Sequence, residues 1–195
     1  MAVEDAKLRA DARANRDRIL EVARDALAAD PEASLHSIAK AAGVGQGTLY
    51  RHFATREALA LGVYRKEVDA LVALAPELLV EHSPLQAFRL WCDRFAQYGR
   101  KKHAIADIVR AAMSDQDFQE TYWPMVDAVR QLMVACERAG EMPPGADAED
   151  FLQLLACMMR IAPTPEGEAR ANRLLALAFR GLGVRDTGSP DRPPS

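Results

Sequence analysis

The chain has 195 residues, which is enough for one large domain or two small ones that bury a core without metal ions or disulfide bonds. It contains 36 Ala and 21 Leu but only 22 Val, Ile and Thr together, and this composition favours helices over sheets. We therefore expect an all-α protein, and a sheet-built enzyme fold is nearly excluded. The formal net charge of −3, taken alone, argues against a nucleic-acid partner, because such proteins usually carry a basic surface.

Cysteines and targeting signals are uninformative in this chain. Cys92, Cys136 and Cys157 form no CxxC motif, so neither a disulfide framework nor a zinc ribbon is expected. The first 16 residues are charged from Glu4 onward and lack the apolar centre of a signal peptide. No apolar run approaches the roughly 20 residues that span a bilayer. We expect a cytoplasmic protein without a membrane association and without a cofactor.

Four helices are predicted in the first part of the chain. Residues 1–11 are polar and are expected to form a disordered arm. A helix is expected over 12–29, where apolar residues repeat at helical spacing and Asp30-Pro31 ends the pattern. Further helices are expected at 35–42, capped by Ser34, at 46–53, and from Thr55 to Ala75, where Pro76 follows. Residues 12–65 are therefore interpreted as one domain.

The second part of the chain contains five more predicted helices. They are separated by proline and glycine residues and cover 84–102, 104–113, 117–138, 148–161 and 166–182. Pro124 predicts a kink or break in the longest of them. These helices belong to a domain expected over 66–182. The tail over 183–195 is rich in Gly, Pro and Asp and is expected to be disordered.

The helices at 35–42 and 46–53 have the pattern of a helix-turn-helix. Their expected inner faces consist of apolar residues, and Gly43 permits the turn between them: Leu35, Ile38, Ala39 and Ala42 in the first helix, Leu49 and Phe53 in the second. The residues that remain on the outer face of the second helix are Gln46, Gly47, Thr48, Tyr50, Arg51 and His52. An amide can bind base edges, while hydroxyls and cations can bind phosphates. This is the chemistry that a helix in the major groove requires.

Charge placement supports the same interpretation. The 24 residues from Ala33 to Arg56 contain no Asp or Glu and form the longest acid-free stretch of the chain. They contain Lys40, Arg51 and Arg56, a local charge of +3, together with two histidines. A surface that faces phosphates must be free of carboxylates. Residues 1–66 carry a charge of +2 and residues 67–195 a charge of −5, so the global value averages two different regions.

The stretch IAKAAGVGQGTLYRHFATREAL resembles the TetR family of transcriptional regulators, and G-V-x-x-G-T-L-Y-R-H-F is its most specific part. The resemblance covers about residues 12–65. It implies that Gln46 approaches bases and that Thr48, Tyr50 and His52 bind phosphates, with Thr55 and Arg56 beside them. Gly45 stands where the family often has a Ser or Thr cap, at a cost of only a few tenths of a kcal/mol.

Other interpretations of these residues remain open. Phe53 and Tyr50 are also typical core residues, and Arg51 and Arg56 could be solvated surface charges. A helical protein–protein adaptor without DNA binding is one alternative function. A metal-binding protein is another, because His103 and Asp107 have the spacing of two ligands on one helix, although no third ligand is evident. No phosphate-binding glycine loop and no nucleophile elbow are present, so we do not expect an enzyme.

Aromatic and methionine side chains of the second domain are candidates for the wall of a ligand pocket. They are Trp91, Phe95, Tyr98, Met113, Phe118, Tyr122, Trp123, Met125 and Met133, and Cys157, Met158 and Met159 add further adaptable surface. Asp93, Arg94 and Arg110 could supply polar anchors. The alternative is that all of them are ordinary core residues. If a pocket exists, an apolar or aromatic small molecule is the expected effector.

The last two helices are predicted to form a dimer interface. The candidate residues are Phe151, Leu155, Met158, Leu174, Leu175, Ala178, Phe179 and Leu182. The helix at 148–161 is apolar on nearly all sides, which requires burial, although burial within one subunit would also satisfy it. The resemblance implies that two copies pair these helices as a four-helix bundle. It also implies a homodimer on a pseudo-palindromic double-stranded DNA operator and repression relieved by a small-molecule effector.

Overall fold

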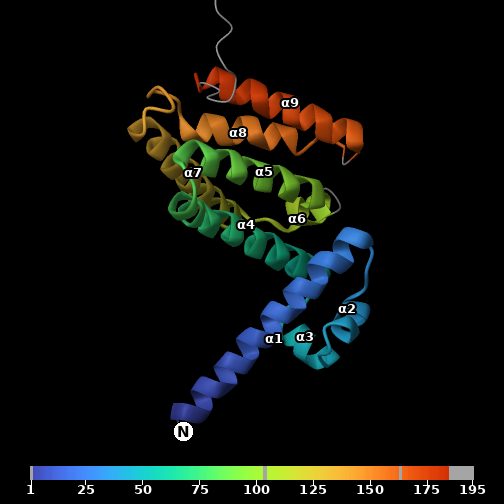
Figure 1. Cartoon of the computed structure of the whole chain (residues 1–195). Helices are drawn as coiled ribbons and strands as arrows, with labels where there is room; N and C mark the ends of the chain where they lie inside the picture. Colours follow the sequence, from blue (N-terminus) through green and yellow to red (C-terminus); the bar gives the residue numbers. More distant parts are fainter. Residues whose placement is uncertain (1, 103–104, 163, 185–195) are drawn as a thin grey trace, which may run out of the picture. The chain divides into compact units, whose positions relative to one another are not determined.

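The structure is a computed structural model that describes residues 2–102, 105–162 and 164–184. Within these residues it contains α-helices joined by short turns, and no strand (Figure 1). The all-α prediction is confirmed. The helices are α1 (Ala2–Ala29), α2 (Leu35–Ala41), α3 (Gln46–His52), α4 (Arg56–Glu81), α5 (Pro84–Lys102), α6 (Ala106–Ala112), α7 (Asp115–Arg138), α8 (Ala148–Met158) and α9 (Pro165–Gly181).

The chain folds into two compact units. Unit 1 comprises residues 1–70 and 101–121, and unit 2 comprises residues 71–100 and 122–195. Helices α4 and α7 each contribute their first part to unit 1 and their last part to unit 2. The division differs from the predicted continuous domains at 12–65 and 66–182. A segment far along the chain, which contains α6, belongs to the same unit as α1–α3.

Apolar side chains from five helices form the core of unit 1. Its fully buried members include Ile19 and Leu27 of α1, Ile38 of α2, Leu49 of α3 and Leu59 of α4. Two residues from the region of α6 belong to the same core: Ile105, the N-cap residue, and Val109, within the helix. The buried residues of α1 to α3 have the helical spacing that the sequence shows. The short helices α2 and α3 are therefore held in place by a core that they share with α1, α4 and α6.

Unit 2 is built around aromatic side chains. Phe88 of α5 contacts Phe151 of α8 and Phe179 of α9, with ring centroids 5.1 and 5.2 Å apart. Trp91 is fully buried, and its indole N–H donates to the carbonyl of Leu71 over 2.8 Å. The cluster ties α5, α8 and α9 together, because each helix buries one aromatic ring in it.

Several predicted boundaries are wrong. Residues 2–11 are helical and continue α1 toward the N-terminus, where a disordered arm was expected. Helix α4 passes through Pro76 and ends at Glu81. Helix α7 continues through Pro124, where a kink or break was expected, so there is no break, and it begins at Asp115. Of the predicted disordered tail, residues 185–195 lie outside the described residues.

Candidate nucleic-acid interface

The α2–α3 segment forms a helix-turn-helix whose geometry follows from a few residues. The Ser34 hydroxyl accepts a hydrogen bond from the Ser37 backbone N–H over 3.1 Å and caps α2. After α2, Gly43 adopts a φ of +64°, which only glycine adopts without strain. The Val44 N–H then donates to the Ala39 carbonyl over 3.0 Å and closes the turn. As predicted, α3 starts after Gly45, which offers no side-chain cap.

The face of α3 that points away from the core carries the predicted contact residues. Leu49 and Phe53 are buried, whereas Tyr50 is 50% exposed. Gln46, Gly47 and Arg51 are exposed, and Thr48 and His52 are partly buried. The helix thus presents an amide, a phenol and a guanidinium to solvent, all from one short element. These groups can donate to base edges and to phosphate oxygens.

Two of these side chains are held by neighbours. The Gln46 amide nitrogen contacts Nδ1 of His36 on α2, which orients the amide. The Arg51 guanidinium donates to the Gly47 carbonyl over 3.1 Å and to the Thr48 hydroxyl over 3.3 Å. Arg51 therefore lies back along α3. His36 was not among the predicted contact residues, and its place in the acid-free stretch was its only signal.

Thr55 and Arg56 have structural partners in the free protein. The Thr55 hydroxyl accepts a hydrogen bond from the Ala58 N–H over 3.1 Å and caps α4. Arg56 donates two hydrogen bonds of 3.0 Å to the carboxylate of Glu32. This ion pair connects the start of α4 to the loop between α1 and α2. Hydrogen bonds from the backbone N–H of Glu57 and from Thr55 lower the pKa of the Glu57 carboxyl. Arg56 is thus already paired with a carboxylate in the free protein.

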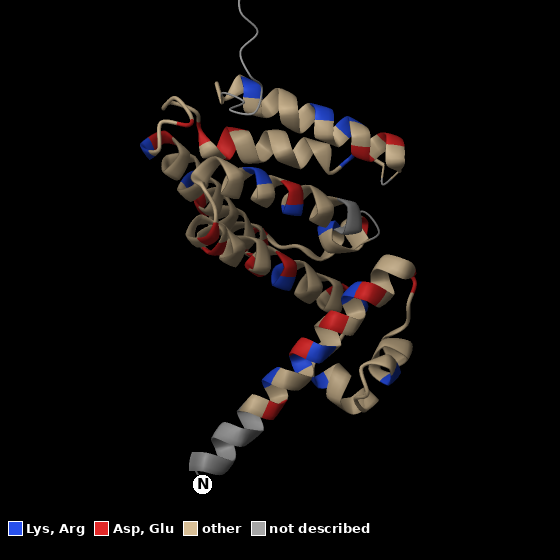
Figure 2. Ribbon diagram, in the orientation of Figure 1, with Lys and Arg blue, Asp and Glu red and all other residues tan. Residues whose placement is uncertain are grey.

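The acid-free stretch carries exposed cations on α2 and α3. Figure 2 shows Lys and Arg but no Asp or Glu on α2 and α3. Lys40 and Arg51 are exposed on these two helices. Because no carboxylate of α2 or α3 opposes them, this side of unit 1 is suited to a polyanion.

The predicted pocket residues lie in different environments. Trp91, Phe95, Tyr98, Met125 and Met133 are buried in unit 2, whereas Phe118 and Trp123 are each 44% exposed. Met113 packs against the core of unit 1, and Tyr122 donates a hydrogen bond of 3.1 Å to Glu149 of α8. Of the nine residues, only Phe95 lines the pocket of unit 2 described next.

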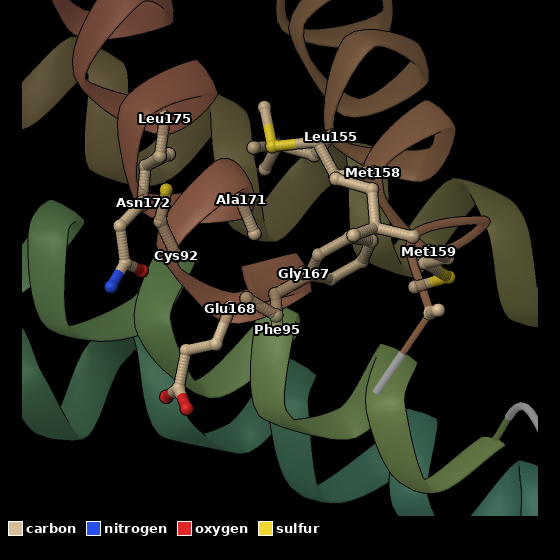
Figure 3. A pocket seen from close by; sticks show the side chains of 13 residues that line it. Cys92, Phe95, Leu155, Met158, Met159, Gly167, Glu168, Ala171, Asn172 and Leu175 are labelled. Atoms are coloured by element: carbon tan, nitrogen blue, oxygen red, sulfur yellow. The ribbon is translucent and has the colours of Figure 1, made fainter. Parts of the chain in front are cut away.

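That pocket lies between α5, α8 and α9 (Figure 3). Its cavity volume is small, about 20 Å³, which is room for about one water molecule, and its wall is mostly apolar. The polar ends of Glu168 and Asn172 lie on one side of it. The lining residues are Cys92, Phe95, Ala96, Leu155, Met158, Met159, Ile161, Ala162, Gly167, Glu168, Ala171, Asn172 and Leu175.

The predicted interface residues divide between the two sides of α8 and α9. Phe151, Leu155 and Phe179 are buried in the core of unit 2, and Leu155 and Leu175 line its pocket. The outward side has a shallow hollow lined by five residues of the prediction, which are Phe151, Met158, Leu174, Ala178 and Leu182, and among others by Leu154, Cys157 and Leu177. Leu154, Leu174 and Leu177 are 48%, 38% and 54% exposed. Periodicity identified the apolar helices but did not separate the two sides.

The described residues offer neither a metal site nor a membrane span. Among the described residues, no three His, Cys, Asp or Glu side chains are placed to hold a metal ion. His103, one of the two residues of the metal hypothesis, lies outside those residues. No described helix is both long and apolar enough to cross a membrane.

Comparisons with known proteins give the same family for both parts of the chain. A family model described as bacterial regulatory proteins, tetR family, matches residues 19–63. A model described as transcriptional regulator SbtR-like, C-terminal domain, matches residues 83–184, more than half of the chain. An HTH-type transcriptional regulator of Staphylococcus aureus (strain USA300) is 29% identical over 119 residues, which is 58% of this chain and 63% of that protein. The chain thus spans less than two thirds of the length of this curated relative.

Solved structures extend the similarity to most of the chain. A TetR transcriptional regulator from Streptomyces coelicolor is 38% identical, with a TM-score of 0.74, over 86% of this chain and 97% of that one. A TetR transcription regulatory protein from Mycobacterium vanbaalenii is 28% identical, with a TM-score of 0.71, over 90% and 98%. SmeT in complex with triclosan shares the fold at 15% identity and a TM-score of 0.60, over 93% and 100%. The chain belongs to the TetR family of transcriptional regulators, which are non-enzymatic DNA-binding proteins.

Proposed function

We propose that this regulator is a ligand-responsive repressor that acts as a homodimer on a pseudo-palindromic operator. The observation that carries the proposal is the exposed face of α3, where Gln46, Tyr50 and Arg51 lie on a surface without carboxylates. In this assignment Gln46 contacts base edges, while Thr48, Tyr50, Arg51 and His52 contact phosphates. Gly47 permits close approach of the backbone to DNA because it has no side chain.

A mobility-shift titration against DNA from upstream of the protein's own gene tests the assignment. Gln46→Ala should reduce the preference for operator over random duplex by about 1–3 kcal/mol, because a bidentate contact to a base is lost. Arg51→Ala should weaken binding to both duplexes and flatten the slope of log K against log salt by about one. Arg130→Ala removes the same charge from an exposed ion pair on α7 and serves as the control.

Two results would contradict the assignment. If the Arg51→Ala and Arg130→Ala proteins bind random duplex equally well, Arg51 does not contact phosphates. If wild-type protein binds neither its upstream DNA nor random duplex, the DNA-binding proposal itself fails.

The pocket between α5, α8 and α9 is the proposed effector site. Its apolar wall suits an apolar or aromatic molecule, and Glu168 and Asn172 can orient a polar group of that molecule. Met158 and Met159 line a narrow space and are flexible enough to move aside for a larger ligand. A protein of the same fold has been solved with triclosan, an apolar aromatic compound. An effector would act through its different affinities for the DNA-binding and released states.

The outward side of α8 and α9 is the proposed homodimer interface. Three leucines are exposed there around one hollow, and a second copy of the same surface would bury them. Pairing would also hold two copies of α3 at a fixed separation, as a two-fold symmetric operator requires.

A further inference from the structure

The N-terminal part of α1 extends past the core of unit 1. From Ala10 onward, Ile19 is the first buried residue of the helix, and the side chains from Ala10 to Arg18 are exposed except for Asn15, which is partly buried. Figure 1 shows this end of α1 continuing beyond α2 and α3. Because a helix rises about 1.5 Å per residue, residues 10–18 alone extend about 14 Å. No core contact accounts for this length.

Two arginines continue the buried face of α1 onto the extension. Leu20, Ala23 and Leu27 follow one another at intervals of three and four residues and are buried in the core. Arg16 and Arg13 precede Leu20 at the same intervals. Side chains three or four residues apart share one face of a helix, so both arginines lie on the side where the core of unit 1 forms. In the sequence, Arg9 continues the spacing.

A contact with the end of α3 confirms the direction of this face. The Arg16 guanidinium lies 5.3 Å from the centroid of the Phe53 ring, and Phe53 is the C-cap residue of α3. A guanidinium over an aromatic ring is a favourable arrangement. One positive charge of α1 therefore lies beside the end of the helix that carries Tyr50 and Arg51.

Of the acidic side chains in and after the extension, Asp17 lies four residues after Arg13 and borders its face, but its carboxylate is directed to α4. The Asp17 carboxylate is 3.8 Å from Nζ of Lys66 on α4, and Glu21 is 3.2 Å from the same nitrogen. Asp11 precedes Arg18 by seven residues, about two turns, so these two share a face opposite to that of Arg13 and Arg16. The face that continues toward α3 is cationic, although the segment also contains two aspartates.

We infer that the Arg13–Arg16 face of α1 binds phosphates of the DNA duplex next to the base pairs that α3 contacts. This inference rests on the proposed function of α3. Phosphates follow one another at about 3.4 Å per base pair along each strand, so an extension of about 14 Å spans about four base pairs. A guanidinium binds phosphate with two parallel hydrogen bonds. Such contacts carry no sequence information, so they add affinity for any flanking sequence.

The experiment measures binding of the full-length protein to a 40-base-pair random duplex as a function of salt. Arg13→Ala combined with Arg16→Ala should make the slope of log K against log salt shallower by about 1.8 per subunit and reduce affinity at least about tenfold at 0.1 M salt. The matched control is Arg18→Ala, which removes one charge from the opposite face of α1 and should change the slope by less than half as much as Arg13→Ala. Arg13→Ala alone leaves the contact between Arg16 and Phe53 intact, so its effect is not one of packing.

Each outcome distinguishes the two proposals. If Arg13→Ala, Arg18→Ala and wild type give the same slope, α1 does not contact DNA and the inference is overturned, while the function of α3 stands. If wild type binds no duplex at all, the proposed function fails first. Arg16→Ala can also lower thermal stability, because it removes the contact with Phe53, so Arg16→Lys is the second variant. Arg16→Lys retains the charge and should restore the wild-type salt slope if Arg16 contacts a phosphate. A slope that stays shallow in Arg16→Lys contradicts this role of Arg16.

Discussion

The three cysteine side chains differ in their surroundings, and this difference predicts their reactivity. Cys92 and Cys136 are buried, whereas Cys157 is exposed on the outward side of α8. Burial raises the pKa of the Cys136 thiol to about 11 and raises the pKa of Cys92 well above its usual value. The thiolate is the reactive form, so native protein at pH 8 should show one fast thiol with an aromatic disulfide reagent, and three after denaturation.

Cys157→Ser provides the control for this measurement and should abolish the fast reaction. Two or three fast thiols in the native wild type would show that the core around Cys92 and Cys136 opens readily. If α8 and α9 form the dimer interface, the rate at Cys157 should also fall as the protein concentration rises.

Side-chain positions along α3 could be predicted from the sequence because a helical period assigns each residue to a face. Leu49 and Phe53 are buried and Tyr50 is exposed, as the spacing indicates. The partner of Arg56 could not be predicted, because Glu32 lies 24 residues away and an ion pair leaves no periodic signal. The same holds for the pocket between α5, α8 and α9, where small residues such as Ala96 and Ala171 make room but carry no recognisable pattern.

At the level of helices, Gly62 decides how closely α4 approaches α1 and α3. A Cβ atom at this position would lie 2.8 Å from Cε1 of Phe53 and 3.1 Å from Cδ2 of Leu20. Glycine in a helix usually costs up to about 1 kcal/mol relative to alanine. Here Gly62→Ala should instead destabilise the protein by about 1–3 kcal/mol, because the buried Phe53 ring cannot move without disturbing the core.

Thermal unfolding followed by circular dichroism measures this effect, and each kcal/mol corresponds to about 2–4 °C in a chain of this size. Gly47→Ala is the matched control in the same unit, because a Cβ there meets no atom within 4 Å. It should raise the midpoint slightly. A higher midpoint for Gly62→Ala would mean that α4 and α3 are not in close contact.

Helix boundaries were harder to predict than helix faces. Pro76 was expected to end α4, but the helix continues because Ala75 and Leu78 on either side of it are buried in unit 2. The burial stabilises the turn that proline weakens, since tertiary packing commonly outweighs local preference. Similarly, residues 2–11 are polar but contain several alanines, and this composition permits the helical extension of α1.

The two units of the molecule are not continuous in sequence. Helix α6 buries Val109 in the core of unit 1, although more than 40 residues separate it from α3 along the chain. No local pattern predicts such a contact. The net charge of −3 also hides a local difference, because the positive charges of α2 and α3 are outweighed by the negative charge of the rest of the chain. DNA binding therefore depends on local charge and not on the total.

Dimerisation through α8 and α9 predicts opposite effects for outward and inward residues. Leu177 is 54% exposed, so Leu177→Glu should leave the subunit folded but give monomers in sedimentation velocity. Operator affinity should fall with it, because two copies of α3 would no longer be held together. Phe179 is buried against Phe88, so Phe179→Glu should unfold unit 2.

Gln131→Glu adds the same charge at an exposed position of α7 and should preserve both the dimer and operator binding. A Leu177→Glu protein that remains dimeric would place the subunit contact elsewhere. Operator binding unchanged in a monomeric Leu177→Glu protein would instead show that one copy of α3 is sufficient. A half-site duplex distinguishes a binding monomer from a binding dimer. A monomer that binds alone shifts the half-site duplex as well as the full operator, whereas a dimer requires both half-sites for full affinity.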